Sequence, residues 1–226
     1  MNIVYTNYPK ESVSQELLTS CAELFSNHYG VWGPLSKLCG KRISLSGIRL
    51  LNDYLYSDNC GLVTATVIGR PTIIVGHSFY SLIRGRSRFS HSKYKITWIT
   101  QLVVHRDYRN HGISKNLLYH SKNHDTVGLG MVTSNPFAIK SLEAVMGQRY
   151  DISQILEVAI QIVRSCGIRY LKDAEIYLDL ETQTSLIDTR FYIDHTEALE
   201  NLEAVSSLSL CRDLPEGHEF FVLILE

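Results

Sequence analysis

The residues best placed to do chemistry lie between Gln101 and Leu118, where the chain reads QLVVHRDYRNHGISKNLL. An apolar, β-branched run ends at a charged loop, and Gly112 then precedes a segment with apolar residues at helical spacing. The first amide groups of a helix have no internal partner, and the helix dipole places partial positive charge beside them. A glycine-containing turn between a strand and a helix is therefore suited to hold phosphate. Arg109 adds a full charge and a forked donor set beside that turn.

The six residues from Arg109 to Ser114 (RNHGIS) resemble the R/Q-x-x-G-x-G/A acyl-CoA loop of the GCN5-related N-acetyltransferases, the GNAT superfamily. In that family the backbone amides of the loop wrap the pyrophosphate of coenzyme A. The resemblance implies that acetyl-CoA is the cosubstrate and that its binding residues are Leu102, Val103, Val104, Arg109, Asn110, His111, Gly112, Ile113 and Ser114. Ser114 is a departure, since the family prefers glycine or alanine there. The alternative is an ordinary strand-to-helix turn with a surface arginine.

A second motif follows at Asn135 and Ala138, which resemble the N-x-x-A start of the family's next helix. In the family the asparagine side chain bonds the pantetheine arm, and a small residue keeps the helix close to the cofactor. Ser134 is the expected N-cap, and Pro136 suits the first helical turn because its missing N–H costs nothing there. A well-capped helix without any ligand is the alternative for this segment.

The elements around these motifs predict an α/β (α+β) fold with a GNAT-like central mixed, mostly antiparallel sheet, flanked by helices and split by a splayed acyl-CoA cleft. Two early helices and a meander before the phosphate loop do not fit a Rossmann unit, whose glycine loop follows its first strand. We expect a single domain over 1–226, with a core at about 3–180 plus 218–226 and an acidic insert at about 181–217. Strands are expected at 3–5, 60–68, 72–82, 94–104, 126–133, 174–180 and 220–225, and helices after Ser12 or Ser14, after Ser46, after Ser134, at 152–166 and at 196–204.

Amide formation needs a base for the amine and a proton for the leaving thiolate. The strand before the loop supplies no carboxylate, so we expect Gln101 and Thr100 to orient a water and His77 to accept a proton. A buried core histidine is the alternative for His77. The family's usual tyrosine acid is replaced by Leu142, and Tyr150 is the expected substitute. Backbone amides of the same strand are expected to stabilise charge developing on the thioester oxygen.

Two aromatic residues between the early helices, Tyr29 and Trp32, are expected to line the acceptor pocket, although packing between helices would also explain them. Charge is divided along the chain: residues 1–150 hold 17 Lys and Arg against 8 Asp and Glu, and residues 151–226 hold 5 against 15. A basic half suits the phosphates of coenzyme A, and an acidic half would attract a cationic amine. The expected acceptor is therefore a small-molecule or peptide amine. The acidic insert is expected to be a lid, a homodimer contact or packing decoration.

Composition narrows the remaining classes. With 226 residues, 45% of them hydrophobic and 20% charged, the chain suits an ordered globular domain. No apolar run approaches the roughly 18–20 residues that span a bilayer, and no signal peptide is apparent, so we expect no membrane partner and a cytoplasmic or nuclear protein. Five scattered cysteines favour free thiols. His120 and His124 lack further ligands, so no metal is expected.

The leading hypothesis is an acetyl-CoA-dependent N-acetyltransferase. A non-catalytic acyl-CoA-binding or regulatory module is the first alternative, because the usual acid and base are missing. Nucleic-acid binding is the less favoured one; its main support is the basic run from Arg84 to Lys95, which a solvated hairpin tip explains equally simply.

Overall fold

Four strands from the first half of the chain form an antiparallel meander. The computed structural model describes residues 2–86, 93–155, 158–165, 167–182, 184–205 and 214–226. Each strand pairs with the next, in the order β1 (Ile3–Pro9), β2 (Cys60–Val67), β3 (Arg70–Arg86) and β4 (Lys93–Val104). Gly69, with φ of 80°, lies in the tight β2–β3 turn, a conformation that glycine adopts readily.

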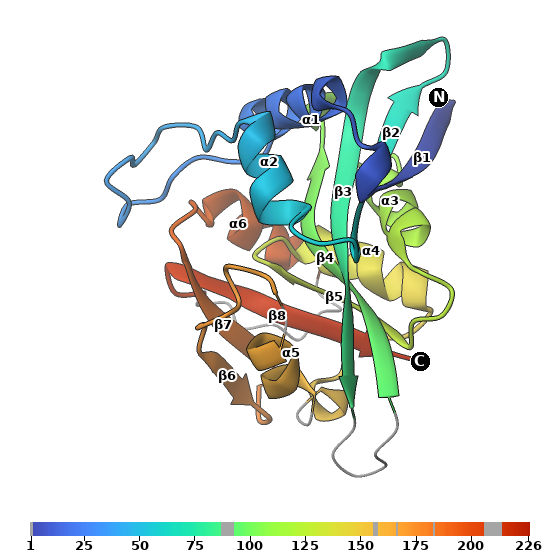
Figure 1. The fold of residues 1–226 in the computed structure, drawn as a ribbon. Coiled ribbons are helices and arrows are strands. Elements are labelled where there is room, and N and C mark those ends of the chain that lie inside the picture. Colours follow the sequence, from blue (N-terminus) through green and yellow to red (C-terminus); the bar gives the residue numbers. More distant parts are fainter. Residues whose placement is uncertain (1, 87–92, 156–157, 166, 183, 206–213) are drawn as a thin grey trace.

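The other half of the sheet is formed by strands from the middle and the end of the chain. β5 (Gly128–Thr133) runs parallel to β4, and the remaining pairings are antiparallel. The full order is β1-β2-β3-β4-β5-β8-β7-β6, with β8 at Gly217–Leu225, β7 at Thr184–Phe191 and β6 at Ile176–Asp179. The mixed, mostly antiparallel α/β sheet predicted from the sequence is confirmed (Figure 1).

Helices cover both faces of this sheet. One face carries α1 (Gln15–His28) and α2 (Gly47–Tyr54), which begin at the predicted caps Ser14 and Ser46, and also α5 (Ala159–Ser165). The opposite face carries α3 (Ile113–Ser121) and α4 (Pro136–Met146) (Figure 1). The alternation within β2 shows the division, because Leu62 packs with α1 and the adjacent Val63 packs with α3.

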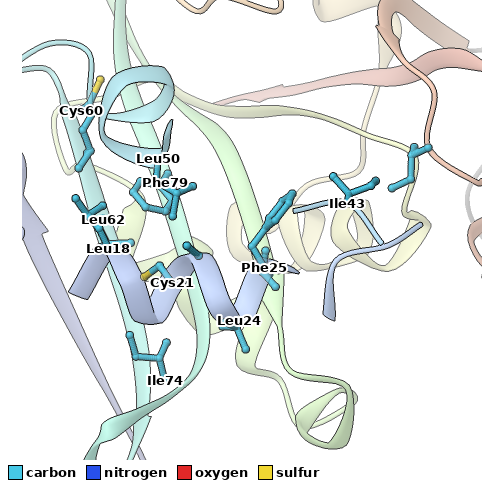
Figure 2. Packing of buried hydrophobic residues seen from close by; sticks show 14 residues of the cluster. Leu18, Cys21, Leu24, Phe25, Ile43, Leu50, Cys60, Leu62, Ile74 and Phe79 are labelled. Atoms are coloured by element: carbon cyan, nitrogen blue, oxygen red, sulfur yellow. The ribbon is translucent and has the colours of Figure 1, made fainter. Parts of the chain in front are cut away.

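The packing under α1 and α2 is shown in Figure 2. Leu18, Cys21 and Phe25 of α1 pack with Leu62 of β2 and Phe79 of β3, and all five side chains are almost fully buried. Burying one such apolar side chain contributes about 1.5–3 kcal/mol. This cluster holds the end of α1, and therefore the loop after it, against the strands that border the site.

Two predicted elements differ in the structure. The segment 152–166, expected to be one helix, begins with the 3-10 helix η3 (Ile152–Gln154), and α5 covers Ala159–Ser165; positions 156–157 and 166 lie outside the described residues. Ile152, Ile155 and Ile162 are all buried. The apolar residues at helical spacing therefore indicated which side chains are buried, and did not require one continuous helix. The acidic segment 181–217 provides β7, an internal strand of the sheet, as well as the predicted helix α6 (Thr196–Ala204).

Cys21, Cys39 and Cys60 are free thiols, and the other two cysteines lie outside the described residues, as does much of the basic run after Arg84. Within the described ranges, none of the helices combines the length and apolarity needed to cross a bilayer.

Candidate functional site

A cleft opens where β4 and β5 separate. The two strands pair only from Thr97 to Ile99 on β4 and from Leu129 to Met131 on β5, although both continue further. Past that point β5 remains bonded to β8, while the end of β4 faces a space of about 700 Å³. This volume lies within the range of about 300–1,000 Å³ typical of small-molecule sites.

The register of β4 changes at the mouth of this divergence. Gln101 pairs with Phe79, but Ile99 pairs with Tyr80, so Thr100 is an extra residue and forms a β-bulge. Bulges re-aim side chains and are common beside active sites. Thr100 and Gln101 both line the cleft.

The loop between β4 and α3 presents unbonded backbone amides. Asn110 and Gly112 have left-handed φ angles of 62° and 73°, and Gly112 is an N-cap whose helix has no side-chain cap. Within the described part of the chain, the amides from Asn110 to Lys115 donate no hydrogen bond to the protein. Curled successive amides at a helix N-terminus form an anion-binding concavity. The geometry fits a diphosphate.

The start of α4 forms the facing wall. Its N-cap is Asn135 rather than the expected Ser134, and the Asn135 side chain accepts from the Phe137 amide at 2.9 Å. The hydroxyls of Ser114 and Ser141 lie 2.8 Å apart and join α3 to α4, which gives the serine that departs from the family pattern a packing contact.

All the residues predicted to bind the cofactor line the cleft, with the exception of His111, whose exposed ring contacts the Arg109 carbonyl. The Arg109 guanidinium donates to the carbonyl of His28 and to the carboxylate of Glu197, both at 2.8 Å. Arg109 therefore ties the loop to α1 and α6. The cationic side chains of Arg106 and Lys115, which sequence reasoning missed, also line the cleft.

The predicted proton acceptor, His77, is fully buried and does not line the cleft. Its Nε2 lies 2.8 Å from Oε1 of Gln101, which does line it. Burial lowers the pKa of His77 to about 4, so the ring is neutral near pH 7. Nδ1 of His77, Nε2 of Gln101 and Oγ1 of Thr100 are buried without a hydrogen-bond partner among the described residues.

The structure does not bring Tyr150 or Trp32 to the cleft. The Tyr150 hydroxyl lies 2.6 Å from Oγ of Ser185, and burial raises the pKa of Tyr150 to about 12. This contact connects the segment after α4 to β7. The Trp32 ring packs edge-on against Phe191, whereas Tyr29 does line the cleft.

Two carboxylates from the acidic segment also line the cleft. Asp194 accepts from the amide and hydroxyl of Thr196, and these bonds lower the pKa of its carboxyl. Glu197 lies on α6 and forms the ion pair with Arg109. Asp194 therefore presents a carboxylate to the cleft, whereas the charge of Glu197 is paired with Arg109 of the loop.

Sequence reasoning missed two further residues near this side, Tyr54 and Glu219. The Tyr54 ring lies 5.6 Å from the ring of Phe79, and burial raises the pKa of the Tyr54 hydroxyl to about 12. Glu219 is a buried carboxyl on β8. Its signal in the sequence was a single acid at the start of the apolar run FFVLIL.

No protein-family model matches the sequence. No curated protein matches it either. Several solved structures share part of the fold. An aminoglycoside acetyltransferase from an uncultured soil metagenomic sample, solved with sisomicin, has a TM-score of 0.44 and 13% identity over 63% of this chain and 86% of that chain. Its trehalose complex is matched over 53% of this chain and 66% of that chain, with a TM-score of 0.38 and 15% identity.

Two other structures match to a similar degree. The NatC complex bound to Gag peptide and CoA has a TM-score of 0.41 and 20% identity, over 64% of this chain and 83% of that chain. Diaminobutyrate acetyltransferase EctA from Paenibacillus lautus, solved with its substrate and coenzyme A, has a TM-score of 0.37 and 22% identity. The match covers 65% of this chain and 74% of that chain. At this similarity, the ligand of the cleft has to be judged from the chain's own residues.

Proposed function

We propose that this protein is an acetyl-CoA-dependent N-acetyltransferase. The observation that carries the proposal is the row of amides from Asn110 to Lys115 that donate to no protein acceptor among the described residues. They lie at the end of β4, at the point where the cleft between β4 and β5 begins. A diphosphate at the loop and a linear arm along the divergence would fill this cleft from end to end.

In this arrangement the amides around Gly112 bind the pyrophosphate, and Arg106 and Lys115 add positive charge. Asn135 and Ala138 border the pantetheine arm from α4. When bound, acetyl-CoA supplies an acetyl group activated as a thioester. The β4 backbone past Ile99 is not paired with β5, so its amides on that side are available to the carbonyl oxygen.

The proposed acceptor is a cationic amine, either a small molecule or the amino group of a peptide. Asp194 and Glu197 border the cleft, and Tyr29 presents an aromatic ring beside them. Carboxylates attract an ammonium group, and an aromatic ring packs well against it. The acceptor would reach the thioester from the face that carries α1.

The experiment is a binding measurement followed by a transfer assay. Calorimetry with acetyl-CoA tests the cleft, and thiol release in the presence of spermidine, an amidated lysine or a short peptide with a free amino terminus tests the reaction. The proposal predicts saturable binding and amine-dependent thiol release. Absence of acetyl-CoA binding would refute it.

A non-catalytic acyl-CoA-binding module is the second candidate. Two observations favour it: Leu142 is fully buried at the family's acid position, and Tyr150 lies away from the cleft. Tight acetyl-CoA binding without thiol release for any amine would select this candidate over the enzyme. Proper positioning alone contributes about 7–11 kcal/mol in favourable reactions, so a missing acid does not by itself prevent turnover.

A further inference from the structure

Glu219 is a buried carboxyl in the sheet that forms no ion pair among the described residues. Glu219, near the start of β8, is 6% exposed, and the Thr189 hydroxyl donates to its Oε2 at 2.9 Å. Burying a carboxyl without a counter-charge is unfavourable, and such groups concentrate at functional sites.

The position of Glu219 in the sheet brings it next to the cleft. The following residue, Phe220, pairs with Thr133 at the end of β5, and Thr133 lines the cleft. Side chains alternate along a strand, so Glu219 points to the same face as Phe221, which packs against Trp98. This is the face that carries α1, α2 and α5.

Two tyrosines connect this carboxyl to the cleft. Thr189, which donates to Glu219, accepts from the Phe191 amide, and the Phe191 ring lies 6.1 Å from the ring of Tyr29, which lines the cleft. The Tyr54 ring lies 5.6 Å from the ring of Phe79, and Phe79 pairs with Gln101 of the bulge across β3 and β4. Glu219, Tyr29, Tyr54 and Gln101 form one cluster, in which Tyr29 and Gln101 line the cleft and Glu219 and Tyr54 lie behind them, connected through Phe191 and Phe79.

The same cluster contains polar atoms that lack partners. Nε2 of Gln101 and Oγ1 of Thr100 are buried, and neither has a hydrogen-bond partner among the described residues. Buried donors and acceptors are almost always satisfied in proteins, by the protein, a water or a ligand. Both atoms are on the strand segment where the thioester carbonyl would lie, so a polar substrate group fits here.

We propose that Glu219 is the general base of the transfer reaction and that Tyr29 and Tyr54 form, with it, the pocket for the acceptor's amino group. The inference rests on the proposed function. The Glu219 carboxylate takes one proton from the acceptor ammonium, which frees the nitrogen lone pair. The nitrogen then bonds to the thioester carbon, the carbon–sulfur bond breaks with its electron pair on sulfur, and the second proton of the nitrogen passes to the thiolate through water. Glu219 finally releases its proton to solvent.

Burial suits Glu219 to this role, because it raises the pKa of the carboxyl to about 7. A base is most effective when its pKa lies near the working pH. The titratable groups that face it are Tyr29 of the α1 end and Tyr54 of α2, and both remain protonated at neutral pH. Thr189 of β7 contributes its hydroxyl.

The test compares Glu219→Gln with Glu226→Gln, which alters an exposed carboxylate at the other end of β8. The assay is thiol release from acetyl-CoA with spermidine, an amidated lysine and a short peptide, measured across pH. Loss of a general base lowers the rate by roughly 10²- to 10⁴-fold. We expect that loss in kcat/KM for Glu219→Gln, an unchanged Kd for acetyl-CoA, and disappearance of the rise in rate with pH near 7. Glu226→Gln should match the wild type.

A second measurement does not depend on turnover. In protein labelled with ¹³C at the glutamate carboxyl, one resonance should titrate near pH 7, vanish in Glu219→Gln and shift when spermidine is added in the presence of coenzyme A. A wild-type pH profile in Glu219→Gln, or an ordinary acidic titration for every glutamate, would overturn the inference while leaving acetyl-CoA binding intact. Absence of acetyl-CoA binding by the wild type would instead overturn the proposed function, and this inference with it.

Discussion

The two ends of the cleft differ in the groups that they present: main-chain amides at one end and side chains at the other. At the proposed phosphate end the donor groups are main-chain amides around Gly112, presented by a loop and the start of one helix. At the proposed acceptor end the groups are side chains from four different elements, of which Gln101 and Glu219 are buried and Tyr29 and Tyr54 are half-buried. A main-chain site tolerates changes of side chain as long as the backbone keeps its path, whereas the side-chain site depends on each residue and on the packing around it.

The largest effect should come from blocking the main-chain end. In Gly112→Trp, a bulky side chain is placed on a residue with φ of 73° at the mouth of the amide concavity. We expect acetyl-CoA affinity to fall by about 10³-fold or more, equivalent to about 4 kcal/mol. Calorimetric titration measures the change.

Gly147→Trp is the matched control for this variant. Gly147 ends α4 with φ of 67° and, like Gly112, has open space around its Cβ position, but it does not line the cleft. It should suffer a similar backbone strain, roughly 1–2 kcal/mol, and keep its acetyl-CoA affinity. Equal affinities of Gly112→Trp and Gly147→Trp for acetyl-CoA would show that the amides around Gly112 do not bind the cofactor.

At the side-chain end, we expect Glu219 to make the free energy of unfolding depend on pH. The pKa of Glu219 is about 7 in the folded chain and 4.5 ordinarily. Between these values the unfolded chain has lost the proton while the folded one keeps it, so the free energy of unfolding falls as pH rises. The full penalty above pH 7 is about 3 kcal/mol, at about 1.4 kcal/mol for each pKa unit.

Glu219→Gln removes this penalty. The variant should therefore gain stability over the wild type at pH 8 and gain little at pH 4, as followed by urea unfolding at several pH values. Glu226→Gln provides the comparison. A stability difference that is the same at both pH values would mean that Glu219 ionises normally in the folded chain.

A smaller effect is expected from the pair beneath the bulge. Gln101→Leu leaves Nε2 of His77 buried without its partner, which should cost about 1–3 kcal/mol of unfolding free energy. In the double variant with His77→Phe, both polar partners are replaced and most of that loss should be recovered. Additive losses in this double-mutant cycle would show that the two side chains do not support one another.

The contrast between the two ends also explains which parts of the site could be predicted from the sequence. The phosphate loop and the start of α4 are contiguous motifs, and the caps Ser14 and Ser46 lie directly before their helices, so local patterns predicted them. Glu219 and Tyr54 belong to no local motif, since 165 positions of sequence separate them and only the pairing of β8 with β5 brings Glu219 near the cleft. The helix expected at 152–166 was wrong for a related reason, because buried isoleucines at helical spacing do not require a continuous helix.

The central claim is that the amides from Asn110 to Lys115 bind a diphosphate. Hydrogen–deuterium exchange of these amides, with and without coenzyme A, tests it most directly, because amides without an acceptor exchange rapidly until a ligand protects them. The account predicts fast exchange in the free protein and slow exchange at Gly112, Ile113 and Ser114 once coenzyme A is added. Amides already protected in the free protein, or unchanged by saturating coenzyme A, would contradict it.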